Sequence, residues 1–199
     1  MGVGEKERVD GRRERSRTSH ARIVSAMLAL IENGHASPSA AQVATEAGVG
    51  LRTVFRHFED MDTLYREMYA AIGARAFPFV QRPFVSDNWR DRLQEIAARR
   101  ATVFEMILPY RITLNIKRFN SDFLMRTYRD ILTLERSLVE TVLPDAVKED
   151  SLSVEALHVA LGFQTWRQLR HDTHLSASRA QEVVAAMLEA LLTRLSRIP

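Results

Sequence analysis

The sequence predicts an all-α protein with a small N-terminal helical domain and a larger helical domain. Three observations support this class. Strong helix formers dominate the composition, apolar residues recur at helical spacing, and glycine and proline stand where helices should end. The 199 residues suffice for one large domain, or for a small domain fused to a medium one, with a buried core.

The composition narrows the classes of protein. Hydrophobic residues at 46% and charged residues at 27% are ordinary values for a soluble globular chain. The absence of cysteine excludes disulfides, thiolate metal sites and a cysteine nucleophile. The charged N-terminus lacks a signal core, and no apolar run approaches the roughly 20 residues of a membrane span. We therefore expect a cytoplasmic protein without a membrane partner.

The N-terminal segment is basic, although the whole chain carries a formal charge of only +3. Between Arg8 and Arg22, six arginines stand against two acids, which gives +4. Because so few residues there are apolar, residues 1–18 are predicted to form a flexible basic arm. The arm is either a solvated tail or a segment that lies along phosphates or in a minor groove. Its candidate DNA contacts are Arg12, Arg13, Arg15 and Arg17.

Three helices are predicted within residues 19–60. The first carries an apolar stripe and ends at Gly34. The second begins at Ser39, whose spacing from Gln42 fits a capping box, and ends at Gly48; the third covers residues 51–58. A fourth helix then runs to about residue 75. It forms, with the proline-containing stretch after it, a connecting segment and joint over residues 61–84.

Residues 85–199 are predicted to form the larger helical domain. Its helices cover about 87–107, ended or kinked by Pro109, then a short one to 116 and another over 122–142. The last two helices follow residue 151. The penultimate helix is apolar on two sides, so it needs two neighbours, one of which can come from a second subunit. The candidate homodimer interface is Leu157, Leu161, Val184, Met187, Leu188, Leu191 and Leu192.

The break at Gly48-Val49-Gly50 predicts a helix-turn-helix. A glycine that adopts positive φ lets a short second helix cross the first steeply. Val49, Val54 and Phe58 would then pack inward. This arrangement leaves an outward face suited to the major groove, where arginine binds guanine and the other polar side chains reach bases or phosphates. The outward residues are Arg52, Thr53, Arg56 and His57. An ordinary helical hairpin with a basic face is the alternative.

The stretch from about Ile23 to Leu64 resembles the DNA-binding domain of the tetracycline-repressor (TetR) family of transcriptional regulators. The matching segments are "IVSAMLALIENG", "VATEAGVG" and "TVFRHF", followed by an acid-flanked start of the fourth helix. The rest of the chain matches that family only in length, in helix count and in its final pair of apolar helices. The resemblance implies a three-helix DNA-binding unit, a larger effector-binding domain, and a homodimer formed by the last two long helices.

The resemblance also implies which residues approach DNA. Those facing the groove or flanking phosphates would be Gly50, Leu51, Arg52, Thr53, Phe55, Arg56 and His57. The start of the second helix, Ser39, Ala40 and Ala41, would approach the DNA backbone. Two positions depart from the family pattern: Phe55 stands where a tyrosine is common, and Met61 where a lysine is common. Both changes remove phosphate contacts, so we expect weaker sequence-independent affinity.

The larger domain offers candidates for an effector pocket lined mainly by apolar side chains. Simple core packing is the alternative for each of them. The tyrosines are the better candidates because a buried hydroxyl must find a partner. The candidate effector-binding residues are Phe104, Met106, Tyr110, Asn115, Phe123, Tyr128, Gln164 and Trp166.

Catalysis, metal binding and a cofactor are not predicted. Glu-x-x-His occurs at Glu32/His35 and Glu155/His158, but Gly34 should separate the first pair. The stretch "HDTH" over 171–174 lies at an expected helix end, and no phosphate-binding or dinucleotide motif occurs. The sequence therefore predicts a ligand-responsive regulator, most simply a repressor that binds a palindromic double-stranded operator as a dimer. The alternative is a helical small-molecule carrier or adaptor without specific DNA binding.

Overall fold

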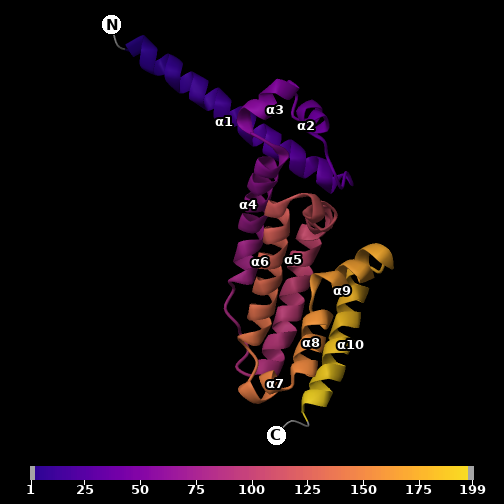
Figure 1. Ribbon diagram of the computed structural model, residues 1–199. Helices are drawn as coiled ribbons and strands as arrows, with labels where there is room; N and C mark the ends of the chain where they lie inside the picture. The colour runs from indigo at the N-terminus through magenta and orange to yellow at the C-terminus, as the bar shows by residue number, and fades with distance from the viewer. Residues whose placement is uncertain (1–2, 197–199) are drawn as a thin grey trace. The chain divides into compact units, whose positions relative to one another are not determined.

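The computed structural model describes residues 3–196, with side chains for Glu14 and for 16–196 (Figure 1). The described residues form helices and no strands, which confirms the all-α class. The α-helices are α1 (Val3–Glu32), α2 (Ala40–Glu46), α3 (Leu51–His57), α4 (Met61–Val80), α5 (Trp89–Lys117), α6 (Asp122–Glu140), α7 (Asp145–Glu149), α8 (Ser151–Ala160), α9 (Phe163–Arg167) and α10 (Ala177–Leu195). A 3-10 helix, η1 (Arg118–Asn120), and a π-helix, η2 (Gln168–Asp172), complete the series.

The chain divides into two compact units whose boundaries differ from the predicted domains. Unit 1 comprises Met1–Ala74 and Pro109–Met125, and unit 2 comprises Arg75–Leu108 and Arg126–Pro199. The segment 109–125 was expected in the larger domain. It belongs to unit 1 because its side chains bond to α1 and α4: the Tyr110 hydroxyl donates to Glu32, and Ser121 donates to Asp62 over 2.7 Å.

The core of unit 1 follows the predicted apolar stripe of the first helix. Ile23 and Met27 of α1 are fully buried, and Val43 of α2, Val54 of α3 and Leu64 of α4 are at most 1% exposed. Figure 1 shows α2 and α3 packed together beside α1. This burial holds two helices of seven residues each, which are too short to be stable in isolation.

The predicted flexible arm is not what the structure shows. Residues 3–18 continue α1, which therefore spans Val3–Glu32 as one helix. The physical reason is that the packed part of α1 already supplies the costly helix nucleus, and extending a helix through good helix formers costs little more. The side chains of Arg12, Arg13 and Arg15 lie outside the described residues, and Arg17 is exposed.

Two helices of the structure pass through prolines at which the sequence predicted an end or a kink. α4 continues through Pro78 to Val80, and α5 includes Pro109 and ends only at Lys117, which merges two predicted helices. A proline in a helix loses one backbone hydrogen bond. After Pro109 the ladder resumes, and the Thr113 hydroxyl donates to the Pro109 carbonyl over 3.1 Å.

The predicted penultimate helix is in fact broken at Gly162. α8 ends at Ala160, and Gly162 caps α9 in an extended conformation. A Cβ at Gly162 would lie 2.8 Å from the backbone oxygen of His158, so the close approach needs glycine. The Leu161 carbonyl, exposed by the break, accepts a hydrogen bond of 2.8 Å from the buried Arg100 guanidinium.

Candidate nucleic-acid interface

Both ends of α2 have the predicted local chemistry. The Ser39 hydroxyl accepts from the Gln42 amide over 3.2 Å, and the Gln42 side chain accepts from the Ser39 amide over 2.9 Å, so the capping box is confirmed. Gly48 has a φ of +62°, as a left-handed turn residue requires. Gly50 has an ordinary φ of −71° and caps α3. Only one of the two glycines is therefore needed for its backbone freedom.

We expect Gly48→Ala to lower the free energy of unfolding by about 1–2 kcal/mol, because alanine is strained in the left-handed region. The added methyl would also lie 2.9 Å from an Arg22 nitrogen. Urea denaturation of the full chain measures the change. Gly50→Ala is the matched control, because nothing lies within 4 Å of its added Cβ. Equal effects at the two positions would contradict this account of the turn.

α3 separates a buried face from an outward face. Val54 and the capping residue Phe58 are each 1% exposed and anchor the helix to the core of unit 1. Arg52 and Arg56, four residues apart, are both exposed, and Thr53 is half-buried. The predicted division of the helix is therefore confirmed for the valine, the phenylalanine and the arginines. No acid lies within residues 50–57, so the outward face is positively charged.

His57 does not point freely outward, contrary to the prediction. It is half-buried, and its ring lies edge-on to the His20 ring of α1 with centroids 6.0 Å apart. Its Nε2 atom is buried and has no hydrogen-bond partner. Burial, then the nearby charges of Arg56 and His20, lowers the pKa of His57 below its ordinary value. The His57 ring therefore packs α3 against α1.

The start of α2 carries the other residues that the resemblance implied. The Ser39 side chain is committed to the capping box, Ala40 is half-buried, and Ala41 is exposed. Arg22 of α1 was not singled out by sequence reasoning, yet its guanidinium donates to the Ala47 carbonyl over 2.5 Å. It thereby fixes the end of α2 beside the Gly48 turn. Its partner is 25 residues away, so local sequence pattern gave no signal for it.

A second polar cluster in unit 1 ties α1 to α4 and α5. The Tyr110 hydroxyl of α5 donates to the Glu32 carboxylate at the end of α1, and the Tyr69 hydroxyl of α4 donates to the Tyr110 carbonyl over 2.9 Å. Tyr110 is 2% exposed, and burial raises the pKa of Tyr69. The partner that the buried Tyr110 hydroxyl requires is therefore a carboxylate of unit 1, the Glu32 side chain, rather than a bound effector.

The chain resembles solved regulators along most of its length. A transcriptional regulator from Rhodococcus sp. Rha1 shares 14% identity, with a TM-score of 0.63 over 87% of this chain and 96% of that one. A putative TetR-family transcriptional regulator from Mesorhizobium loti shares 17% identity, with a TM-score of 0.55 over 90% of this chain and 97% of that one. The chain has the fold of TetR-family transcriptional regulators.

The multidrug binding protein EbrR, solved with imidazole, shares 20% identity, with a TM-score of 0.55 over 84% of this chain and 88% of that one. No protein-family sequence model and no curated protein sequence matches the chain. Within the part of the chain that the structure describes, no helix is both long and apolar enough to cross a bilayer. The helix-turn-helix of unit 1 lies in a chain that shares its fold with these three solved proteins.

The candidate effector residues are not brought together as one group. Tyr110, Asn115 and Phe123 belong to unit 1, whereas the other five belong to unit 2. Within unit 2, Phe104 is 4% exposed and meets Phe163 edge-on at 5.4 Å, and Trp166 is 3% exposed. Met106 and Tyr128 are half-buried, and Gln164 is exposed. Phe104 and Trp166 therefore remain the candidates that share a site.

A cavity of about 10 Å³ lies beside these two aromatic residues and the Gly162 break. Its lining includes Arg100, Ala101, Phe104, Gly162, Trp166 and Val184. The Trp166 indole donates to Glu105 over 2.9 Å, and Arg170 binds the same carboxylate through two nitrogens at 2.7 and 2.9 Å. The Arg170 bond lowers the pKa of Glu105. A cavity of this volume holds about one water molecule, so an effector needs a more open arrangement.

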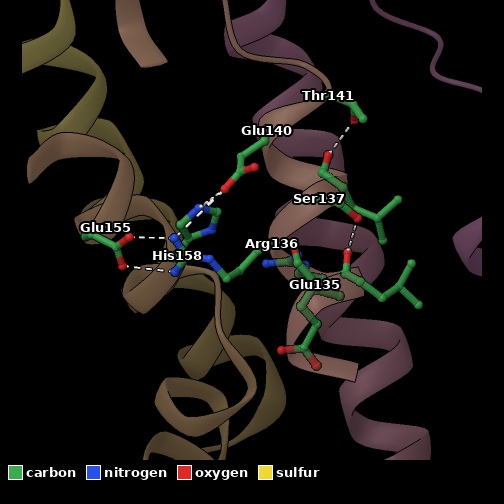
Figure 2. A network of polar contacts seen from close by, with 10 residues as sticks. Glu135, Arg136, Ser137, Glu140, Thr141, Glu155 and His158 are labelled. Carbon is green, nitrogen blue, oxygen red and sulfur yellow. Dashed lines mark hydrogen bonds and ion pairs between the residues drawn. The ribbon is translucent and has the colours of Figure 1, made fainter. Parts of the chain in front are cut away.

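Glu155 and His158, one of the predicted Glu-x-x-His pairs, lie in a network between α6 and α8 (Figure 2). Arg136 binds the Glu155 carboxylate through both terminal nitrogens, at 2.9 and 2.5 Å, and His158 lies 3.1 Å from Glu140. The other pair is separated as expected, because Gly34 has a φ of +91°. Among the described residues, no group of three or more His, Cys, Asp or Glu side chains is arranged to hold a metal ion.

Unit 2 should lose stability as the pH falls below about 6.5. The His158 side chain is 7% exposed; burial and the Arg136 charge lower its pKa, while Glu140 opposes them. The unfolded chain then binds the proton more readily, so stability is full above the unfolded pKa and falls as the pH drops toward the folded pKa. Denaturation of His158→Gln between about pH 5 and 8 should show a flatter profile. The control, exposed Gln168→Ala, should keep the wild-type profile; the same flattening there would contradict the assignment.

The candidate dimer residues are mostly core residues of the protomer. Leu157, Leu161 and Leu188 are at most 2% exposed, and Val184 and Leu192 are 7% and 9% exposed. Only Met187 and Leu191 are half-buried. The apolar stripes of the last helices pack inside unit 2, where α8 and α10 run side by side (Figure 1). Five of the seven candidate interface residues are therefore buried within the protomer itself.

Proposed function

We propose that the chain is a ligand-responsive transcriptional regulator, a repressor that binds a palindromic operator as a dimer and leaves it when a small effector binds. The observation that carries this proposal is the outward face of α3. Val54 and Phe58 anchor the helix, and the anchored helix presents exposed Arg52 and Arg56 within a segment, residues 50–57, that contains no acid. Arginine at such a position can bind guanine edges or phosphates in a major groove. The comparisons support the proposed function through the fold that the chain shares with solved transcriptional regulators.

The dimer surface that we propose is an exposed apolar stripe of α8. Leu152 and Val159 are 67% and 64% exposed, and Ala156 lies between them on the same helical face. Exposed apolar side chains that lie together on one face can form an interaction surface. A two-fold axis at this stripe would pair it with its own copy, as isologous dimers do. Two copies of α3 would then read two half-sites related by the same symmetry.

Release by an effector follows from linkage. The effector must bind more tightly to a conformation that binds DNA less well. Bound DNA must then lower the affinity for the effector by the same factor. The site that we propose surrounds Phe104 and Trp166 beside Gly162. The small cavity there would have to widen, and the break between α8 and α9 offers the place, since the backbone ladder is already interrupted. Its lining is largely apolar, which favours an apolar effector.

The bond between Tyr110 and Glu32 should contribute more stability than the bond between Tyr69 and Tyr110. The first joins a hydroxyl to a carboxylate and the second a hydroxyl to a neutral carbonyl. We expect Tyr110→Phe to cost about 1.5–3 kcal/mol and Tyr69→Phe about 0.5–1.5 kcal/mol. Urea denaturation of each variant gives the two free energies. If Tyr110→Phe costs no more than Tyr69→Phe, the carboxylate contact does not hold α1 to α5 in solution.

The experiment that tests the function is selection of binding sites from a random duplex library by the purified chain at near-physiological salt. A two-fold symmetric site is the expected result, with an affinity that falls steeply as salt rises. A helical carrier or adaptor would instead recover no motif and would bind duplexes only weakly. Site-independent binding that vanishes at moderate salt would therefore refute the regulator and favour that alternative.

A further inference from the structure

The outward face of α3 carries an apolar pair beside its arginines. Leu51 and Phe55 are 45% and 49% exposed, although both side chains are large and hydrophobic. They stand four residues apart, so they are neighbours on one side of the helix, and Arg52 and Arg56 form the parallel row next to them. Neither apolar residue belongs to the core of unit 1. The pair is therefore free to meet a partner together with the arginines.

We propose that Leu51 and Phe55 read the C5-methyl groups of thymines in the major groove, an inference that rests on the DNA-binding function proposed above. The major-groove edge of thymine presents a methyl group beside an oxygen acceptor, and apolar side chains contact that methyl. The Phe55 ring has no hydroxyl with which to reach a phosphate. Its exposed edge and the Leu51 methyls suit an apolar feature of the bases instead.

The positive charge of this α3 face favours DNA as its binding partner. Residues 50–57 contain two arginines and no acid, so a second copy of the same face would be repelled. The major groove of DNA presents both kinds of contact on one surface. Phosphates or guanine edges can bind the arginines, and thymine methyl groups can contact the apolar pair. One helical turn advances about 5.4 Å and one base step about 3.4 Å, so the two methyls should lie one or two base pairs apart.

The test removes the methyl group alone. Each thymine of a duplex selected by the full chain is replaced, one position at a time, by deoxyuridine, which keeps base pairing and loses the C5-methyl. We expect one or two positions in a half-site to weaken wild-type binding about fourfold each, the value of one buried carbon. Phe55→Ala or Leu51→Ala should bind the thymine and uracil duplexes equally at the position that each side chain contacts. Their half-exposed positions let the fold survive truncation, which thermal unfolding checks.

The control is Arg56→Ala, which should bind both duplexes more weakly but keep the wild-type ratio between them. Equal wild-type affinities for all thymine and uracil duplexes would overturn the inference while the regulator stands. Discrimination that survives both Leu51→Ala and Phe55→Ala would also overturn it, because the methyl would be read elsewhere. Failure to select any specific duplex would refute the proposed function itself and, with it, this reading of α3; an acidic protein partner for the face predicts that result.

Discussion

Replacing Arg52 or Arg56 with alanine is expected to weaken binding to the selected duplex by about 10- to 100-fold each. Both side chains are exposed on α3, so their removal leaves the fold intact. An arginine that binds a guanine edge contributes sequence preference as well as affinity, whereas one that binds a phosphate contributes affinity alone. Titration of wild-type and variant chains against the selected duplex and against single-base variants of it separates the two roles.

The charge-matched control for these variants is Arg90→Ala, which removes an exposed arginine of unit 2. It should change affinity for the duplex by less than about threefold, the size expected of a screened charge outside the proposed contact face. The account of α3 fails if Arg90→Ala weakens binding as much as Arg52→Ala does. It also fails if the α3 variants lose their dimer or unfold, because the arginines would then be structural.

The second large effect is expected from placing a charged residue at a buried or at an exposed position of unit 2. Leu188→Glu is expected to unfold the chain or destabilise it by about 3–5 kcal/mol, since it places an unpaired charge at a position that is 1% exposed. Val159→Glu, at a position 64% exposed, should leave the protomer folded and instead give monomers by sedimentation. Like charges would face each other across the proposed two-fold axis.

The opposite pattern would contradict the proposed surface. A folded monomer from Leu188→Glu would return the interface to the stripe that the sequence indicated, and a persistent Val159→Glu dimer would exclude the α8 stripe. Thr193→Glu serves as the control, since Thr193 is exposed on α10 and lies outside the proposed stripe. It should change neither the unfolding free energy nor the sedimentation coefficient appreciably.

Local chemistry explains why the helix-turn-helix was predictable. The capping box of Ser39 and the positive φ of Gly48 each depend on residues within a few positions of one another. Val54 and Phe58 follow helical spacing from a turn already located, so their burial was predictable too. Contacts over long sequence distances were not. His57 lies against His20 of α1, and nothing near either histidine in the sequence indicates that pairing.

The larger unit shows the limits of apolar periodicity. A stripe on a helix indicates that the helix is buried, but it does not identify the neighbour, so Leu157 and Leu188 were assigned to a subunit interface. The break at Gly162 depends on the backbone oxygen of His158 and on Arg100, which lies 61 residues from Leu161. Of the two outcomes expected at Pro109, an end or a kink, the structure excludes the end, because the helix continues to Lys117.

Oxidative footprinting of side chains tests most directly the claim that the outward face of α3 binds DNA. Hydroxyl radicals modify exposed aliphatic and aromatic side chains, and mass spectrometry gives the rate at each residue. With the selected duplex bound, oxidation of Leu51 and Phe55 should fall, while that of exposed Phe77 in unit 2 should stay unchanged. Unchanged oxidation of Leu51 and Phe55 with the duplex fully bound would show that DNA binds elsewhere and would contradict the account.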